Sequence, residues 1–187
     1  MLNYNSPINK EIKHNDISVK EFSPIMKLNL RGKKREFFTI VGKHLDMILP
    51  TEANTSSSSS KLTSIWLSPD EWMVISNEKT EKDTNKYDFE ESLYNSISKN
   101  NLGAVIDVTD HFVMLELEGK NIYELFASGS PFNFNEFKEK KGSTTQTLLN
   151  NINVIIHNKG ENLVNLFVRR SFSEHLHSWI NDSASRL

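Results

Sequence analysis

The sequence predicts an α+β protein in which helices pack on antiparallel sheets, formed by two copies of a strand–helix–hairpin–helix unit. Two observations predict this class. Segments in which apolar and polar residues alternate, as in half-buried strands, are interspersed with segments whose apolar residues recur at helical spacing. These elements also follow the same order in both halves of the chain. No residue-level repeat accompanies that order, so the duplication is inferred from the pattern of elements alone.

The first half begins with a strand and a helix. "PIMKLNL" (residues 24–30) alternates like a strand, and the apolar stripe after it belongs to a helix that Pro50 ends. The Ser-rich stretch 51–61 is predicted to be a solvated loop. A hairpin and a second helix follow. The stripes of the two helices consist of Phe37, Phe38, Val41 and Leu45, and of Phe89, Leu93 and Ile97.

The hairpin is predicted over "TSIWLSPDEWMVIS", in which "SPDE" has the composition of a turn, with Pro at its second position. With a four-residue loop, Leu67 opposes Trp72 and Trp66 opposes Met73. This register places the two tryptophans on opposite faces of the sheet. We therefore expect one tryptophan in the core of sheet and helices, and the other against helices or a partner subunit.

The second half repeats the order of elements. Strand patterns and a helix are followed by a long loop, three further strand patterns and a closing helix. The predicted strands are 104–110, 112–119, 145–150, 152–158 and 162–170, the helices 120–128 and 171–184, and the loop 130–143.

Composition sets limits on domain organisation and on partners. With 187 residues, 37% hydrophobic and 25% charged, the chain suits one soluble globular domain. We interpret the polar residues 1–23 as an N-terminal arm and residues 24–187 as a single α+β domain. A net charge of -2 gives no general attraction to nucleic acid, and no apolar run approaches the ~20 residues of a membrane span. Because the N-terminus also lacks a secretory signal, we expect a cytoplasmic protein that binds neither nucleic acid nor membrane.

A search for catalytic chemistry finds no complete active site. Cysteine is absent, which excludes thiolate nucleophiles, and no dinucleotide, phosphate-loop, zinc-protease or serine-hydrolase motif occurs. His175 and His177, two apart on a predicted helix, point about 200° apart and cannot chelate one ion. Asp70 and Glu71 are interpreted as turn residues before they are considered as an acid–base pair. We therefore predict no catalytic, cofactor-binding or metal-binding residue on this chain.

Two adjacent arginines are the better candidates for binding an anion. Arg169 and Arg170 precede a predicted helix N-terminus, where guanidinium groups are suited to phosphate or carboxylate. The simpler interpretation, a strand-end pair that bonds the acidic side chains of a partner, is favoured over a small-molecule site.

Several ordered motifs resemble the sarcosine oxidase gamma subunit family. "WLSPDEWMVIS" resembles that family's W-L-G-P-D-E-W-L segment, and "LNLRG" its strand ending in Arg-Gly, here Arg31 and Gly32. "AVIDVTDHFVMLELEGKNIYELFASGSPFNF" is similar to its V-D-V-S-D run, strand, helix and following loop, and "NLFVRRSFSEHLHSWI" to its C-terminal segment. The likeness runs in order from about Ile25 to the C-terminus. The sequence departs from the family pattern at Ser68, Ser130, Asn133 and Arg169, where Gly, Cys, Asp and Pro are expected.

The resemblance implies a fold like the folate-binding domain of aminomethyltransferases and a role as a non-catalytic gamma subunit in assembly. It implies a heterotetramer with alpha, beta and delta subunits that demethylates sarcosine to glycine oxidatively, with tetrahydrofolate as the one-carbon acceptor. FAD, FMN, NAD and tetrahydrofolate are then expected on the partner subunits and none on this chain. The candidate interface residues are Trp66, Pro69, Asp70, Glu71, Trp72, Arg169 and Arg170.

Two other functions stay open at this point. Relatives that oxidise N-methylglutamate use a similar small subunit, so the chain could serve an N-methylglutamate dehydrogenase. A stand-alone folate-binding protein of the aminomethyltransferase type would need a carboxylate at the folate amine and a second domain, and this chain is short for both.

Overall fold

The computed structural model describes residues 5–8, 10–14, 16–22, 25–78 and 88–187. Part of the predicted N-terminal arm, residues 1–4, 9, 15 and 23, lies outside the described residues. In the described ranges, no helix is both long enough and apolar enough to cross a membrane.

The chain packs as two compact units, one of them formed by two separate segments. Unit 1 consists of Met1–Ser23 and His111–Leu187, and unit 2 of Pro24–Asp110. The first segment of unit 1 has the bounds of the predicted arm. Residues 24–187, predicted as one domain, comprise unit 2 and the rest of unit 1, and that single domain stays a prediction.

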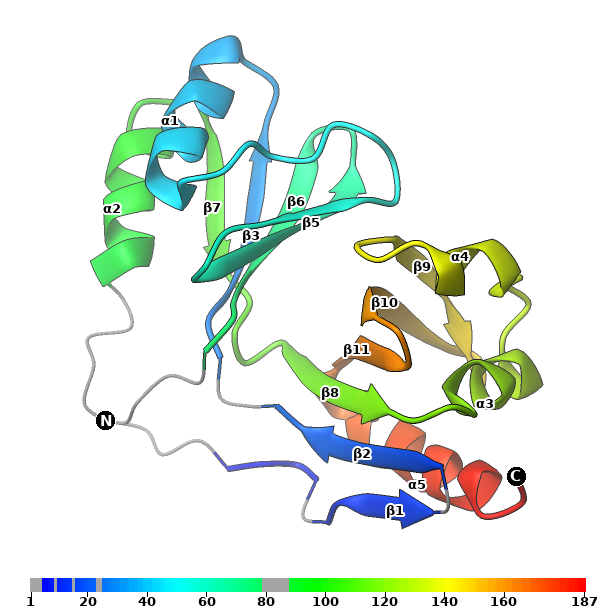
Figure 1. Ribbon diagram of the computed structural model, residues 1–187. Coiled ribbons are helices and arrows are strands. Elements are labelled where there is room, and N and C mark those ends of the chain that lie inside the picture. Colours follow the sequence, from blue (N-terminus) through cyan, green and yellow to red (C-terminus); the bar gives the residue numbers. More distant parts are fainter. Residues whose placement is uncertain (1–4, 9, 15, 23–24, 79–87) are drawn as a thin grey trace. The chain divides into compact units, whose positions relative to one another are not determined.

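Unit 2 is a five-stranded antiparallel sheet with two helices (Figure 1). The strand order is β4-β5-β6-β3-β7, so that β3, the first strand in sequence, lies between β6 and β7. The elements are β3 (Lys27–Gly32), α1 (Arg35–Leu45), β4 (Ser56–Ser58), β5 (Leu62–Ser68), β6 (Glu71–Ser76), α2 (Asp88–Ile97) and β7 (Gly103–Asp107).

The helices of unit 2 bury the stripes that the sequence predicts. Phe37, Val41 and Leu45 of α1 are buried, as are Leu93 and Ile97 of α2. They pack on one face of the sheet, whose buried contribution to this core is Leu28, Leu30, Trp72, Val74 and Val105. Each helix is therefore held by its amphipathic face rather than by helix propensity alone.

Unit 1 contains a six-stranded antiparallel sheet in the order β1-β2-β8-β11-β10-β9. Figure 1 shows β1 and β2, from the N-terminal segment, continuing the sheet beside β8. Its strands are β1 (Ile12–His14), β2 (Ile17–Glu21), β8 (Phe112–Glu118), β9 (Thr144–Leu149), β10 (Ile152–Gly160) and β11 (Leu163–Arg169). Its helices are α3 (Ile122–Gly129), α4 (Asn135–Glu139), the 3-10 turn η1 (Arg170–Phe172) and α5 (Ser173–Ala184).

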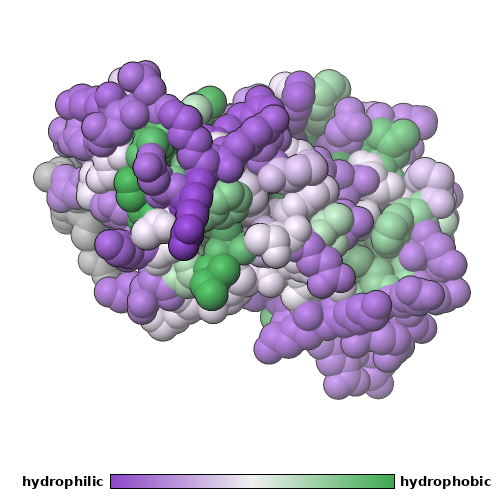
Figure 2. All heavy atoms as spheres, turned by 90° about the horizontal axis from the view of Figure 1, so that it is seen from above, coloured by the Kyte–Doolittle hydropathy of each residue, from purple (hydrophilic) through white to green (hydrophobic). Residues whose placement is uncertain are grey.

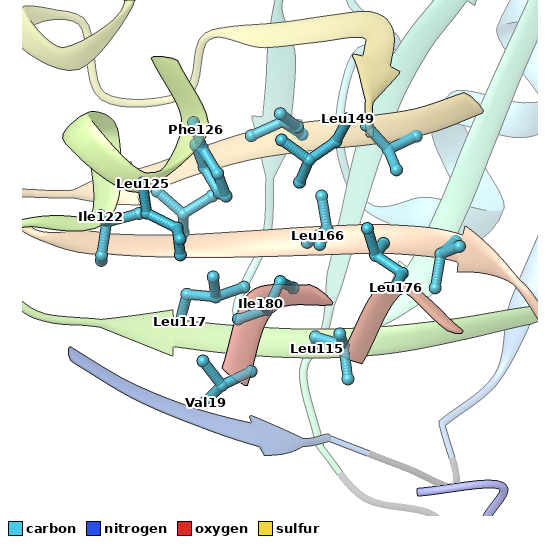
Figure 3. Close-up of a cluster of buried hydrophobic side chains, with 14 of the residues drawn as sticks. Val19, Leu115, Leu117, Ile122, Leu125, Phe126, Leu149, Leu166, Leu176 and Ile180 are labelled. Carbon is cyan, nitrogen blue, oxygen red and sulfur yellow. The ribbon is translucent and has the colours of Figure 1, made fainter. Parts of the chain in front are cut away.

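The core of unit 1 forms between one face of its sheet and the helices α3 and α5 (Figure 3). The helices contribute Ile122, Leu125 and Phe126 from α3 and Leu176 and Ile180 from α5. The sheet contributes alternate residues, as expected for one face of a pleated sheet. These sheet residues include Val19, Leu115, Leu117, Leu149 and Leu166.

Unit 2 is inserted into a strand pair of unit 1. Strands β2 and β8 are antiparallel neighbours, and the whole of unit 2 lies between them in sequence. The two ends of unit 2 are held together, because the Lys27 backbone N–H donates to Thr109 Oγ1 (3.0 Å) and the Val108 N–H donates to the Lys27 carbonyl (2.9 Å). An inserted unit with adjacent ends can replace a hairpin loop without distorting the host sheet.

The predicted α+β class with antiparallel sheets and packed helices is confirmed. The duplicated order is visible in both sheets, since β4-β5-β6-β3 and β9-β10-β11-β8 have the same arrangement. Two predicted loops were wrong in part. The Ser-rich stretch contains strand β4, whose backbone pairs with β5 although its side chains are hydroxyls, and the loop 130–143 contains helix α4, held by the buried Phe137.

Candidate functional site: the tryptophan hairpin and the arginine pair

The hairpin between β5 and β6 has a different register from the predicted one. Trp66 lies directly opposite Trp72, and Ser68 opposite Glu71, with a register shift between Trp66 and Ser68. Leu67 is thus an extra residue in β5. Because a shift of one residue moves a side chain to the other face, the bulge brings both tryptophans to the same face. The prediction of tryptophans on opposite faces was wrong.

Trp72 is an internal residue of unit 2. Its side chain is 1% exposed, and its indole Nε1–H donates to the Pro50 carbonyl at 2.8 Å. The indole lies 5.4 Å from the Phe38 ring, edge to face, and 5.9 Å from the Phe37 ring, measured between centroids. Trp66 packs against the same core but is only partly buried. The tryptophan pair therefore holds the hairpin to helix α1.

The turn at Pro69 and Asp70 presents two carboxylates to strand β3. Neither turn residue has a positive φ, which excludes the type I′, II′ and II turns. The Glu71 carboxylate accepts a hydrogen bond from Asn29 Nδ2 at 2.7 Å and lies 3.8 Å from Arg31 Nε. It is therefore occupied by side chains of the neighbouring strand.

Asp70 is held by its own turn and by two cations. Its carboxylate accepts a hydrogen bond from the Ser68 hydroxyl at 2.9 Å and lies 3.4 Å from Lys33 Nζ and 3.8 Å from an Arg31 nitrogen. The Ser68 hydrogen bond, with the charges of Lys33 and Arg31, lowers the pKa of Asp70. In addition, the Asp70 carbonyl accepts the Gly32 backbone N–H at 3.1 Å. The acidic turn is thus a clasp between the hairpin and the end of β3.

Asn29 and Lys33 of this clasp were not predicted as site residues, and Arg31 was named only because of the family resemblance. A signal for two of them exists in the alternation of β3. Leu28 and Leu30 face the core, which leaves Asn29 and Arg31 together on the opposite face. The sequence does not, however, show that β3 pairs with β6.

The two arginines, both in unit 1, have different environments. Arg170 donates from its guanidinium to the Asn5 carbonyl and from its backbone N–H to the His111 carbonyl. It therefore fastens the N-terminal segment. Arg169, at the end of β11 and opposite Phe112, is exposed. Its guanidinium has no hydrogen bond or ion pair with any residue that the structure describes. Arg169 and Arg170 therefore do not form one anion-binding site together.

No group of three or more metal-ligating side chains occurs among the described residues. His157 of β10 is buried at 5% exposure, and burial, with a smaller effect of the Lys159 charge, lowers the pKa of His157 to about 4. Its imidazole is neutral at physiological pH.

The buried His157 predicts a pH-dependent stability. Below its ordinary pKa of 6.5, the unfolded chain takes up a proton that the folded imidazole does not accept until about pH 4. The free energy of unfolding is therefore full above about pH 6.5 and falls toward pH 4, by on the order of 3 kcal/mol for this group. Urea unfolding followed at a series of pH values measures the slope.

A His157→Gln chain is the matched control, since it lacks the titrating group while other histidines, including His177 with its lowered pKa, stay in place. Its unfolding free energy should lose this part of the slope between pH 6.5 and 4. Identical slopes for the two chains would show that His157 does not carry the effect.

A family model described as "Sarcosine oxidase, gamma subunit family" matches residues 32–186. No curated protein matches the sequence. Among solved structures, a chain of the heterotetrameric sarcosine oxidase from Corynebacterium sp. U-96 is similar with a TM-score of 0.81 at 21% identity, over 94% of this chain and 88% of that one.

A more distant likeness reaches an enzyme of the glycine cleavage system. Aminomethyltransferase T from Bartonella henselae is similar with a TM-score of 0.61 at 14% identity, over 92% of this chain. The chain spans only half of that protein, because the match covers 50% of its length. At these identities the two likenesses show the fold, and the second confirms the predicted likeness to the fold of aminomethyltransferases.

Proposed function

The chain belongs to the sarcosine oxidase gamma subunit family, and from this membership we propose that it is the non-catalytic gamma subunit of a heterotetrameric sarcosine oxidase. Its partners are alpha, beta and delta subunits, and the complex converts sarcosine to glycine oxidatively, with tetrahydrofolate as the one-carbon acceptor. FAD, FMN, NAD and tetrahydrofolate bind to the partner subunits. The location is cytoplasmic, where dinucleotide and folate cofactors of metabolism are found.

The observation that supports a structural role is the use of the hairpin's polar groups within the chain. Asp70 and Glu71 supply the two carboxylates of the family-like motif. These carboxylates contact Arg31, Lys33 and Asn29 of the same chain. Trp72 is part of the core. The motif thus stabilises a hairpin, which suits a subunit that acts through assembly.

The surface offers apolar groups for association. Ile48 is 84% exposed, and Ile106 and Phe172 are about half exposed. Figure 2 shows one face of the molecule, on which apolar side chains reach the surface between hydrophilic ones. A partner that binds over such side chains removes their apolar surface from water. The candidate interface on the hairpin comprises the exposed Pro69 and the part-exposed Trp66, with Asp70 and Glu71 at its rim.

The family match favours sarcosine oxidase over an N-methylglutamate dehydrogenase and over a stand-alone folate-binding protein. This chain also covers only half of aminomethyltransferase T, so the other half of that enzyme has no counterpart in the match.

Co-expression of the chain with the three partner subunits tests the proposal. The chain should be recovered with an affinity-tagged alpha subunit, and the assembled complex should oxidise sarcosine. The purified single chain should show no flavin absorbance. Stoichiometric flavin on the single chain, or a monodisperse single chain that never associates with the flavoprotein subunits, would overturn the proposal.

A further inference from the structure

A groove lies mostly on the face of the unit 1 sheet opposite its core, with Pro131, Thr147 and Val154 also in its lining. It has a volume of about 500 Å³ and lies over β9, β10 and the adjoining ends of β8 and β11. The register explains its lining, because Arg169 is opposite Phe112, Gln146 opposite Ile155 and Leu148 opposite Asn153. Their neighbours Val113, Val154 and Val168 are part of the core. Alternation along the strands therefore assigns these six side chains to the second face.

The groove combines an apolar surface with one cation. The apolar part of its lining includes Leu148, which is 38% exposed, the half-buried Phe112, and Ile155, which is 8% exposed. Arg169 is exposed at the end of the groove and has no counter-charge within the described chain. No carboxylate lines the groove. The complementary group is therefore an anion that comes from another molecule.

Two polar contacts connect the end of α3 and the residue after it to β9 and to the residue that follows β9. The Ser130 hydroxyl lies 3.2 Å from that of Thr147, and the Asn150 N–H donates to the Gly129 carbonyl at 2.9 Å. The C-terminal end of α3 and Ser130 therefore lie beside the C-terminal half of β9.

We propose that this groove docks a segment of a partner subunit that presents a carboxylate side chain beside an apolar one. The carboxylate pairs with Arg169, for which a planar guanidinium offers two parallel donors. The apolar side chain covers Phe112 and Leu148. The amide of Asn153 can donate to and accept from the peptide groups of the segment. Because the arginine and the leucine are both exposed, the groove does not enclose a small ligand, which a pocket normally buries almost completely.

This inference rests on the proposed function, because it requires that the chain be a subunit. Arginine and aromatic residues are the frequent energetic anchors of protein interfaces, and here both occur in one groove. Charge complementarity selects an acidic segment as the occupant.

The test compares variants of the full chain, each co-expressed with the alpha, beta and delta subunits of a sarcosine oxidase, with the tag on alpha. Arg169→Glu and Leu148→Asp should each reduce the amount of this chain recovered with alpha by about tenfold or more. Arg169→Lys, which keeps the charge, should be reduced less. The matched control is Lys141→Glu, the same reversal of charge at an exposed position of unit 1 outside the groove, which should be recovered like the wild type.

A photo-crosslinking amino acid at position 148 gives a second measurement that does not depend on a destabilising change. It should yield a crosslink to a partner subunit, at a peptide containing Asp or Glu, whereas the same group at position 141 should yield none. Recovery of wild type, Arg169→Glu and Leu148→Asp in equal amounts, without a crosslink at 148, would overturn the docking proposal alone. Failure to recover even the wild type would overturn the proposed function and this inference with it.

A calorimetric titration of the purified chain with benzoate separates a docking groove from a small-molecule site. Benzoate carries a carboxylate on an apolar ring and so tests the same chemistry without a partner. No saturable heat is expected. Saturable binding that Arg169→Glu abolishes, together with undisturbed assembly of that variant, would assign the groove to a small carboxylate and overturn docking.

Discussion

Replacing Trp72 by alanine should lower the free energy of unfolding of unit 2 by about 3–5 kcal/mol. The side chain is 1% exposed and packs between the Phe37 and Phe38 rings of α1 and the sheet, so its removal leaves a cavity that these rings cannot fill. The change also leaves the Pro50 carbonyl without its indole donor. Urea unfolding followed by far-ultraviolet circular dichroism measures the loss.

Two control variants separate the contributions. Trp66→Ala removes the opposing tryptophan, which is only partly buried, and should cost less than half as much. Trp72→Phe keeps an aromatic ring but removes the N–H, and should cost about 1–3 kcal/mol, the range for an unmade buried hydrogen bond. Equal losses for Trp66→Ala and Trp72→Ala would contradict the assignment of Trp72 as the anchor of the core.

Helices α1, α2, α3 and α5 could be predicted from the sequence because their signal is local. The spacing of Phe37, Val41 and Leu45 identifies the face that α1 buries, and Leu93 and Ile97 do the same for α2. A helix presents its i, i+4 and i+8 residues to one side whatever it packs against. Apart from the short strands β1, β2 and β4, the strands were similarly predictable from alternation, which is why the α+β class followed from the pattern alone.

The register of the β5–β6 hairpin was not predictable, because it depends on a bulge at one residue that gives no distinctive sequence signal. Leu67 is the bulged residue, and nothing in "WLSPDEW" separates a bulge at a leucine from regular pairing. A glycine there would have been a signal. The error reversed the face of one tryptophan, because both tryptophans lie on the face that packs against the core of unit 2.

The clasp around Asp70 and Glu71 could not be predicted from the sequence for a different reason. Glu71 bonds Asn29, which lies 42 residues earlier, and the contact exists only because β3 is inserted between β6 and β7. Local turn chemistry correctly identified a turn at these residues. It could not show that their charges are used within the chain.

The insertion of unit 2 between β2 and β8 is also a long-range property. A polar N-terminal segment with scattered isoleucines resembles a loose arm in sequence, since β1 and β2 are short and contain Lys13, Lys20 and Glu21. Their apolar residues are nevertheless buried when β2 pairs with β8. The strand pattern is present, but three to five residues are too few to distinguish it from a tail.

Deletion of residues 1–23 should therefore abolish the stable fold of unit 1 while unit 2 stays folded. The segment contributes Ile12, Ile17 and Val19 to the unit 1 core, each at most 3% exposed. At about 1.5–3 kcal/mol for each buried side chain, the loss is roughly 5–9 kcal/mol, comparable with the whole stability of a domain. The deletion also leaves the β2 side of β8 unpaired. Hydrogen exchange should show that amides of β8 and β11 lose protection, whereas those of β3 and β6 keep theirs.

Two point variants test whether the loss of amide protection comes from the missing strand β2 rather than from the shorter chain. Val19→Asp buries a charge in the unit 1 core and should reproduce the loss of protection in β8, whereas Lys13→Asp, at an exposed side chain of the same segment, should not.

A fragment of residues 24–110 should fold alone, because it contains all five strands of its sheet and both helices of its core. If the deleted chain kept full protection in β8 and Val19→Asp behaved like the wild type, the N-terminal segment would be an arm that lies on unit 1 without stabilising it. The expected outcome instead makes the first 23 residues a structural part of the unit that carries the groove at Arg169, so that truncation of the N-terminus would also impair docking there.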